Sequence, residues 1–207
     1  MAQFDFPSSP STNQTYTANG VSFKWDGVAW RRIKSAPEFL RVAHTDASHN
    51  QTLTDNTTHW VQFGSAYDDT ESGWTSGASN YYTIQTTGYF LVTAQAVITS
   101  NTPNSLRDWA LGVELSTDNG GSWSLIQNAG GRGGGTESTD TDTVTPVVTL
   151  VLNFTAGNRI RVRAYANTDS GTWQVDEDLG DTSGGSDYGG NNFDNQKGTR
   201  LHIIRLH

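Results

Sequence analysis

Hydrophobic and polar residues alternate along much of the chain in short stretches, which is the pattern of half-buried β-strands. The stretches end at turn-forming residues such as Thr87-Gly88, Asn119-Gly120-Gly121 and Ala156-Gly157-Asn158. After residue 37 we expect strands at Phe39–His44, Trp60–Phe63, Tyr81–Gln85, Tyr89–Ser100, Trp109–Ser116, Ser122–Ile126, Val144–Phe154, Arg159–Asn167 and Leu201–Leu206. No run has the period and length of a helix, so the pattern predicts an all-β sandwich or barrel.

The first 34 residues read as a separate small unit. Three strand candidates are joined by Asn19-Gly20 and Asp26-Gly27, and such pairs between alternating stretches are strong hairpin signals. We therefore predict a three-stranded β-meander over residues 1–34, a hinge at Ser35-Ala36-Pro37, and one β-sandwich domain over residues 38–207. A unit of about thirty residues buries little surface alone, so we expect it to dock on a partner.

The N-terminal unit is mildly basic in an otherwise acidic chain. The whole sequence has 13 Lys and Arg against 21 Asp and Glu, a formal net charge of −8, which argues against general nucleic-acid binding. The basic residues form either a solvated face or an attachment surface for an acidic partner. The residues assigned to such an anchor are Phe4, Phe6, Lys24, Trp25, Trp30, Arg31 and Arg32.

Composition excludes several classes of protein. Hydrophobic residues make up only 34% of the 207 residues, but aromatic residues reach 11%, which is unlike a disordered chain. There are no cysteines, so disulfides and thiolate metal sites are excluded. No apolar run is long enough to span a membrane, and Met1-Ala2-Gln3-Phe4-Asp5 is unlike a secretory signal, so we expect neither.

The candidate chemistry is sparse. The five histidines have no metal-binding spacing, and there is no Gly-x-Ser-x-Gly elbow, so we expect no enzymatic activity. Acidic clusters occur at Asp68-Asp69-Thr70-Glu71 and at Asp176-Glu177-Asp178 with Asp181. Neither has EF-hand spacing, so we predict solvated loop charge and no cofactor, with Ca²⁺ as the alternative. Two Gly-rich stretches, residues 128–142 and 168–197, are expected to be long loops.

Two motifs predict local structure. Ser116-Thr117-Asp118-Asn119-Gly120-Gly121-Ser122-Trp123 resembles the Asp-box of sialidases, which is a structural hairpin in that family. Here we expect Asp118 to cap the turn amides and Gly120 to supply a positive φ. In Arg159-Ile160-Arg161-Val162-Arg163, one strand face carries three arginines, which we expect carboxylates to pair across a subunit contact.

Further surface residues are candidates for contacts. The predicted subunit-interface residues are Tyr89, Arg159, Arg161, Arg163, Ile203 and Leu206. Trp74 and Trp173, together with Trp60, are candidates for stacking on a host glycan if they are exposed.

The N-terminal sequence resembles a short module of tailed-phage virion proteins, common in cyanophages and frequent in tail fibres. The matching residues are Phe4–Pro10, Gln14–Val21 and Trp25–Trp30. This resemblance covers about the first 33 residues and implies a place on a virion.

Three later stretches resemble C1q/TNF-like jelly rolls. Thr83–Val92 is similar to a Gly-Tyr strand of that family, Leu150–Ile160 to its Gly-Asp hairpin with Asn158 in place of Asp, and Leu201–Ile204 to its last strand. The Phe-Ser-Gly that normally precedes the last strand is missing here. The resemblance implies an antiparallel jelly-roll sandwich that assembles as a homotrimer.

Together these features lead us to expect a non-enzymatic structural protein on the outer surface of a bacteriophage particle. A head decoration (cement) protein that binds the major capsid protein is slightly favoured over a tail-fibre or adhesin protein. A carbohydrate-binding module is the alternative from a different class. No membrane insertion is expected.

Overall fold

The computed structural model describes residues 5–18, 21–33, 37–44, 50–77, 80–100, 105–132, 143–169, 172–176 and 198–206. The chain divides into two compact units, Met1–Ala36 and Pro37–His207. Every regular element in the described ranges is a β-strand, which confirms the predicted all-β class. Over the same ranges, no helix is long and apolar enough to cross a membrane.

The first unit is an antiparallel meander of three strands. It consists of β1 (Thr15–Ala18), β2 (Val21–Trp25) and β3 (Trp30–Arg32), in the order β1-β2-β3. The Asp26 carboxylate closes the second hairpin, because it accepts hydrogen bonds from the backbone N–H groups of Val28 and Ala29, at 2.8 and 2.7 Å. The turn that Asp26-Gly27 predicted is therefore stabilised by a side chain as well as by glycine.

Aromatic rings form the small core of this unit. Phe6, from the proline-rich lead, lies 5.4 Å from Trp30 in a stacked arrangement and 5.0 Å from Phe23 in an edge-on one. Tyr16 and Trp25 also contact Trp30, at 6.0 and 5.7 Å between ring centroids. Such pairs add stabilisation beyond the apolar area they bury, which suits a unit too small for an aliphatic core.

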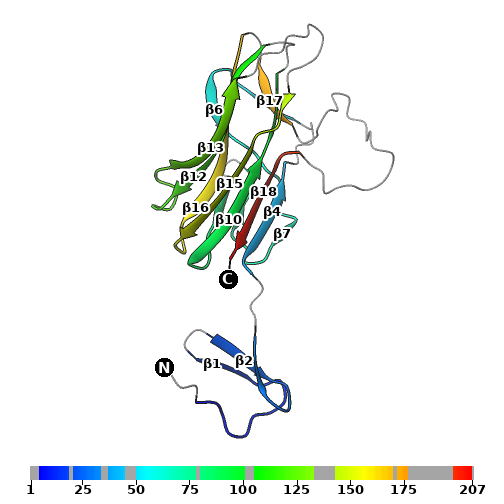
Figure 1. The fold of residues 1–207 in the computed structure, drawn as a ribbon, viewed down its shortest axis with the longest axis vertical. Helices are drawn as coiled ribbons and strands as arrows, with labels where there is room; N and C mark the ends of the chain where they lie inside the picture. Colours follow the sequence, from blue (N-terminus) through cyan, green and yellow to red (C-terminus); the bar gives the residue numbers. More distant parts are fainter. Residues whose placement is uncertain are drawn as a thin grey trace, which may run out of the picture. The chain divides into compact units, whose positions relative to one another are not determined.

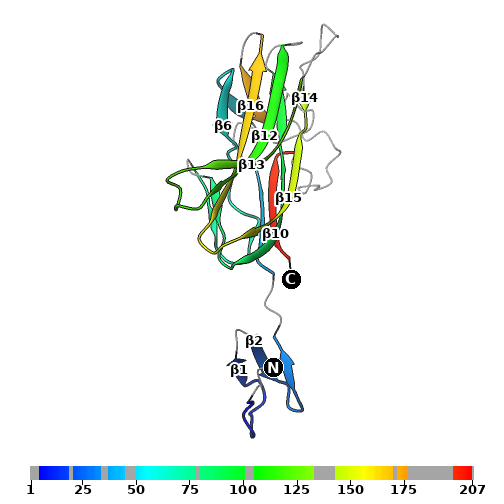
Figure 2. The same cartoon turned by 60° about the vertical axis from the view of Figure 1, so that its left-hand side comes forward.

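The second unit is built from three antiparallel sheets. The first contains β15 (Val147–Phe154), β10 (Gly88–Gln95), β18 (Arg200–Arg205), β4 (Phe39–Ala43) and β7 (Asp68–Asp69), in that order. The second contains β14 (Thr143–Val144), β11 (Val97–Ser100), β17 (Trp173–Asp176) and β5 (Asn50–Leu53). The third contains β13 (Ser124–Arg132), β12 (Leu106–Ser116), β16 (Arg159–Thr168), β9 (Tyr81–Thr83) and β8 (Trp74–Thr75), with β6 (Thr57–Trp60) also paired to β16. Figures 1 and 2 show the strands of the first and third sheets as two layers.

The core lies between these layers. Alternate residues of β10 and β16 are buried, as the period of two predicts, and they meet in one cluster with the inward residues of β4 and β18. The largest fully buried side chains are Trp173, Tyr82, Phe90 and Phe154. The C-terminal strand β18 is central to its sheet, between β10 and β4, as its apolar sequence predicted.

Two of the predicted strands are interrupted. The stretch predicted at Val144–Phe154 is split into β14 and β15 at Thr145-Pro146, because proline cannot donate a ladder hydrogen bond. The stretch predicted at Tyr89–Ser100 is split at Ala96, where the chain leaves the partners of β10 and joins those of β11.

Several strands lie where the sequence predicted none. The strands β5, β7, β8 and β17 were missed, and β6 precedes the expected Trp60–Phe63. The expected loop at 168–197 contains β17, whose Trp173 and Val175 are fully buried. The expected loop at 128–142 begins as the end of β13, where the Trp109 ring occupies the space a Cβ on Gly131 would take. Tertiary packing, which local propensity does not encode, decides these segments.

One buried carboxylate ties the start of the domain to the core. Glu38, just before β4, accepts hydrogen bonds from the Tyr82 hydroxyl at 2.9 Å and from the backbone N–H groups of Gln85 and Thr86, at 2.8 and 3.0 Å. Burial, together with the adjacent Glu38 carboxylate, raises the pKa of Tyr82 far above its ordinary value. Both carboxylate oxygens of Glu38 thus accept at least one hydrogen bond, as burial of a polar group requires.

Candidate functional site

The outward side of the sheet β15-β10-β18-β4 forms a continuous surface, which we call the open face. Its residues are those that alternate with the core residues on each strand. Leu91 on β10 lies directly opposite Val151 on β15 and Ile204 on β18, and Ile204 lies opposite Phe39 on β4. Side chains directly opposite one another on one side of a sheet are in contact distance. Four apolar side chains therefore form one row across four strands.

More apolar surface borders this row. Tyr89 and Val151 are 59% and 55% exposed, and Leu206, whose backbone N–H donates to the Tyr89 carbonyl, is also exposed. An isolated exposed hydrophobic residue is ordinary, but a contiguous group of this kind on a sheet marks a surface that binds another molecule. The open face is therefore the first candidate site.

A polar row runs beside the apolar one. Thr93 pairs with Thr149 and with His202, and His202 pairs with Arg41 on β4. Burial, followed by the nearby charges of Arg200 and Arg41, lowers the pKa of His202. The neutral form of His202 is therefore favoured, which limits the charge that this residue adds to the open face.

The structure separates the predicted interface residues into three groups. Tyr89 and Leu206 lie on or beside the open face and are exposed. Ile203 points the opposite way and is completely buried in the core of its own chain, since it alternates with His202 and Ile204 along β18. The expectation that Ile203 contacts another subunit is therefore not met. The three arginines lie on the other outer surface of the sandwich, along β16.

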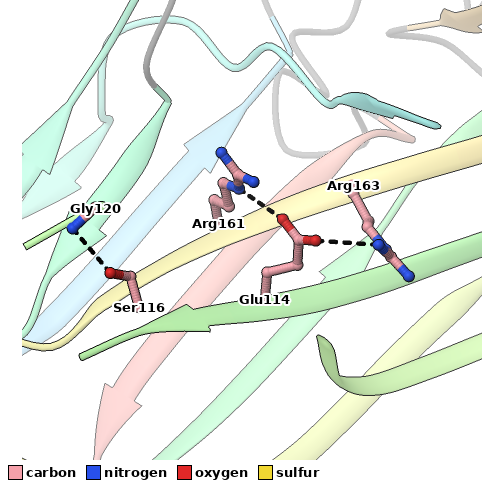
Figure 3. Close-up of polar contacts among 5 residues, drawn as sticks. All are labelled: Glu114, Ser116, Gly120, Arg161 and Arg163. Atoms are coloured by element: carbon pink, nitrogen blue, oxygen red, sulfur yellow. Dashed lines mark hydrogen bonds and ion pairs between the residues drawn. The ribbon is translucent and has the colours of Figure 1, made fainter. Parts of the chain in front are cut away.

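Those arginines are organised by a buried glutamate. Glu114 on β12 lies between two of them: its Oε2 accepts from the Arg161 Nε at 2.6 Å, and its Oε1 accepts from the Arg163 Nη1 at 3.1 Å. Figure 3 shows the carboxylate between the two guanidinium groups. The side chain of Glu114 is only 7% exposed and that of Arg161 only 14%, so this is a largely desolvated ion pair.

Aromatic rings complete the arrangement. The Arg161 guanidinium lies 4.0 Å from the centre of the Trp123 ring and 4.9 Å from that of Trp60. Arg159 lies 4.3 Å from the Tyr81 ring and also donates to the backbone carbonyl of Asn119. Arginine favours such stacking because its planar cation is weakly hydrated. We call Glu114, Arg159, Arg161, Arg163 and these rings the arginine ladder.

The arginine ladder corrects one expectation, namely that carboxylates of another subunit pair with the three arginines. The alternation along Arg159–Arg163 was correctly interpreted as one cationic side of a strand, since Ile160 and Val162 are buried. The expected pairing carboxylate, however, comes from the same chain. A partner subunit is therefore not needed to neutralise Arg161.

The hairpin at Ser116–Trp123 has the predicted structure. The Asp118 carboxylate accepts from the Ser122 N–H and hydroxyl, at 2.9 and 2.6 Å, and from the Ser116 hydroxyl at 2.8 Å. Ser116 in turn accepts from the Gly120 N–H, as Figure 3 shows, and Gly120 has a φ of 92°. The turn holds Trp123 over Arg161, so its role here is to position the ladder.

We predict that Asp118 makes the stability of the protein depend on pH in the acid range. Its hydrogen bonds to Ser122 and then Ser116 lower the pKa of Asp118 from 3.8 to about 2. A carboxylate whose pKa is lower in the folded state than in the unfolded state stabilises the fold at pH values above its unfolded-state pKa. This stabilisation is lost as the pH falls towards the folded-state pKa. Asp118→Asn should therefore melt at a lower temperature than the wild type above pH 5, and the difference should shrink between pH 4 and pH 2.

The control for this prediction is Glu71→Gln. It removes an exposed carboxylate for which no hydrogen bond is seen in the described part of the chain. Its melting temperature should follow the wild type at every pH. A difference between Asp118→Asn and the wild type that stays constant from pH 6 to pH 2 would contradict the assignment.

The tryptophans proposed for glycan stacking differ in exposure. Trp173 is completely buried, and its Nε1 donates to the Thr54 carbonyl at 2.9 Å, so it presents no surface to a sugar. Trp74 is partly buried and donates to the Gly64 carbonyl at 3.0 Å. Trp60, one of the rings of the arginine ladder, is 49% exposed, and it is the one of the three that presents most of an aromatic ring.

The residues proposed for an N-terminal anchor take two roles. Phe6, Trp25 and Trp30 form the aromatic core of the first unit, and Phe4 lies outside the described residues. Lys24, Arg31 and Arg32 are exposed, and Lys24 lies opposite Arg31. Arg31 donates to the Asp26 carboxylate at 2.8 Å, which lowers the pKa of Asp26 to about 2.

Two carboxylates of the first acidic cluster make contacts that stabilise the fold. Asp68 pairs with Arg41 at 2.9 Å, and Asp69 accepts from the N–H groups of Gly73 and Trp74. Within the described residues, no three His, Asp or Glu side chains are grouped to hold a metal ion. The second cluster, the Asp176 side chain with Glu177, Asp178 and Asp181, lies outside the described residues.

Comparison with known proteins identifies the fold. No family model matches the sequence, and no curated protein matches it. The structure is similar to that of Eiger TNF from S. frugiperda, with a TM-score of 0.56 and 14% identity, over 83% of this chain and 93% of that one. It is also similar to murine APRIL, with a TM-score of 0.51 and 12% identity, over 83% and 100% of the two chains. The second unit is thus a TNF-like jelly roll, as predicted.

Proposed function

We propose that this protein is a non-enzymatic structural protein on the outer surface of a bacteriophage particle, where it acts as a homotrimeric head decoration (cement) protein. The observation that carries the trimer is the open face, with its apolar row of Val151, Leu91, Ile204 and Phe39. The place on a virion rests on the resemblance of the first 33 residues to phage modules.

The open face suits association with copies of the same chain. It is apolar at its centre and polar along one border, which is the usual arrangement of a protein interface. Closed three-fold symmetry lets identical faces meet without leaving an unpaired one, and the resemblance to C1q/TNF-like proteins implies this symmetry. A trimer would cover Tyr89 and Val151, which a monomer leaves more than half exposed.

The N-terminal unit supports attachment to a shell. Its aromatic residues are used in its own core, which leaves the exposed Lys24, Arg31 and Arg32 as the groups available to a partner. Because Arg31 already pairs with Asp26, the basic surface is modest, and three copies in a trimer would multiply it. An acidic capsid surface is the partner that this charge favours.

Localisation and particle stability test this proposal. Immunogold labelling of intact particles should place the protein on the head, and particles stripped of it should lose heat stability. Labelling confined to the tail would instead support a tail-fibre role. Absence from particles would overturn the virion role altogether. The trimer is tested separately, because the purified protein should sediment at three times its mass of 22.5 kDa.

A further inference from the structure

A small hollow lies on the outer surface of the sheet β13-β12-β16, on the same side as the arginine ladder. Its volume is about 130 Å³. It exists because the central strand β12 carries Ala110 and Gly112 where its neighbour β16 carries Tyr165 and Arg163, which lie directly opposite them. The residues around it are Thr58, Ala110, Leu111, Gly112, Asn128, Arg163, Ala164 and Tyr165.

Gly112 gives the neighbouring side chains room at the edge of the hollow. A Cβ at this residue would lie 2.6 Å from the Leu125 Cδ1 and 3.4 Å from the Arg163 Cγ. No larger residue fits there without displacing its neighbours. On β12 the hollow is thus lined by residues with small or no side chains at 110 and 112, while the residues with polar side chains come from the neighbouring strands.

Those functional groups are hydrogen-bonding ones. Arg163 contributes a guanidinium, and Asn128 on β13, directly opposite Gly112, contributes an amide. The Tyr165 hydroxyl donates to the Asn56 Oδ1 at 2.7 Å, so its oxygen can still accept a hydrogen bond. Thr58 adds a second hydroxyl. A ligand with several hydroxyl groups and an anionic group would match this set.

The local charge favours an anion. Glu114 is shared between Arg161 and Arg163, so two cations are balanced by one carboxylate. Among the described residues, Arg163 makes one hydrogen bond, through Nη1, and its side chain is 33% exposed. The remaining N–H groups of its planar guanidinium are suited to binding a second carboxylate.

An aromatic surface lies next to the hollow. Trp60 on β6 is directly opposite Arg163, and about half of it is exposed. Sugar rings present C–H groups that pack on indole rings, whereas their hydroxyl groups seek polar partners at the edge. The hollow is smaller than the pockets that enclose whole drug-sized ligands, so it would hold one charged group while the ring lies outside.

We propose that this hollow binds a carboxylated sugar residue, with the carboxylate on Arg163, hydroxyl groups on Asn128 and Tyr165, and the ring beside Trp60. The site differs from the open face and lies on the opposite side of the sandwich. It goes beyond the proposed structural role, because a decoration protein does not require a sugar site.

The test uses the full-length protein and two probes that differ by one carboxylate, methyl glucuronide and methyl glucoside. Binding is measured by saturation-transfer NMR. The glucuronide should bind about tenfold more tightly than the glucoside, the difference expected for one charge-assisted contact. Arg163→Gln should remove this preference. Arg132→Gln is the matched control, since it removes an exposed arginine from β13 on the same side of the sheet and should change the affinity less than twofold.

A second variant leaves the charges in place. Ala110→Leu fills the hollow from β12, and it should abolish glucuronide binding. Equal binding of the two glycosides, or equal losses with Arg163→Gln and Arg132→Gln, would overturn the proposal. Acetate binding as tightly as the glucuronide would also overturn it, because the site would then recognise any carboxylate, including an acidic protein side chain. These outcomes are independent of oligomeric state and of localisation on the particle.

Discussion

Leu91→Glu is expected to convert the proposed trimer into a folded monomer of 22.5 kDa. Leu91 lies at the centre of the open face, between Val151 and Ile204. A glutamate there would place a charge in the interface of every copy, and removing a charge from water costs several kcal/mol per ion. A single chain would tolerate the change better, because Leu91 points away from the core and keeps partial access to solvent. Sedimentation velocity gives the mass directly.

Two further variants sharpen this test. Val151→Glu introduces the same charge where the side chain is 55% exposed in the single chain, so it should dissociate the trimer without unfolding the monomer. Leu125→Glu is the matched control, since Leu125 is an exposed leucine on the other outer surface of the sandwich, and it should leave the trimer intact. If Leu91→Glu and Val151→Glu both sediment like the wild type, the open face is not the subunit interface.

The open face also shows how much of the candidate site could be predicted from the sequence. The period of two along β10 correctly separates inward from outward residues, so Tyr89 could be placed outside from the sequence alone. Ile203 could not, because Leu201–Leu206 is apolar on both sides and lacks the alternation that distinguishes them. The row across four strands depends on register between β15, β10, β18 and β4, and register is a property of pairing between distant segments.

The contacts of the two buried carboxylates could not be predicted from the sequence either, because they also join segments that are distant in the chain. Glu38 and Tyr82 are 44 residues apart, and neither lies in a motif that suggests a contact. The arginine pattern on β16 was visible in the sequence, but its partner Glu114 lies 47 residues before Arg161 on β12. In contrast, the hairpin at Ser116–Trp123 was predicted in detail, because the hydrogen bonds of its Asp118 and Ser116 side chains join residues within a few positions.

The buried position of Glu114 makes it the residue of the ladder whose loss should cost most. Glu114→Ala leaves Arg161, 14% exposed, without its carboxylate. Breaking a buried ion pair in this way costs about 3–5 kcal/mol, because an uncompensated charge stays in the protein. We expect the lower end of that range, since Arg163 can turn towards water. Chemical denaturation of the variant and the wild type measures the difference in the free energy of unfolding.

Removing the charge partner should restore much of this loss. In the double variant Glu114→Ala with Arg161→Met, no cation remains buried between Trp60 and Trp123, and the methionine side chain can pack against both rings. It should therefore be more stable than Glu114→Ala alone, although the second variant removes a further native contact. If the losses in unfolding free energy from the two substitutions instead add, the cost of Glu114→Ala comes from a cavity. If Glu114→Ala alone is within about 0.5 kcal/mol of the wild type, as for an ordinary surface substitution, the pair is not buried in solution.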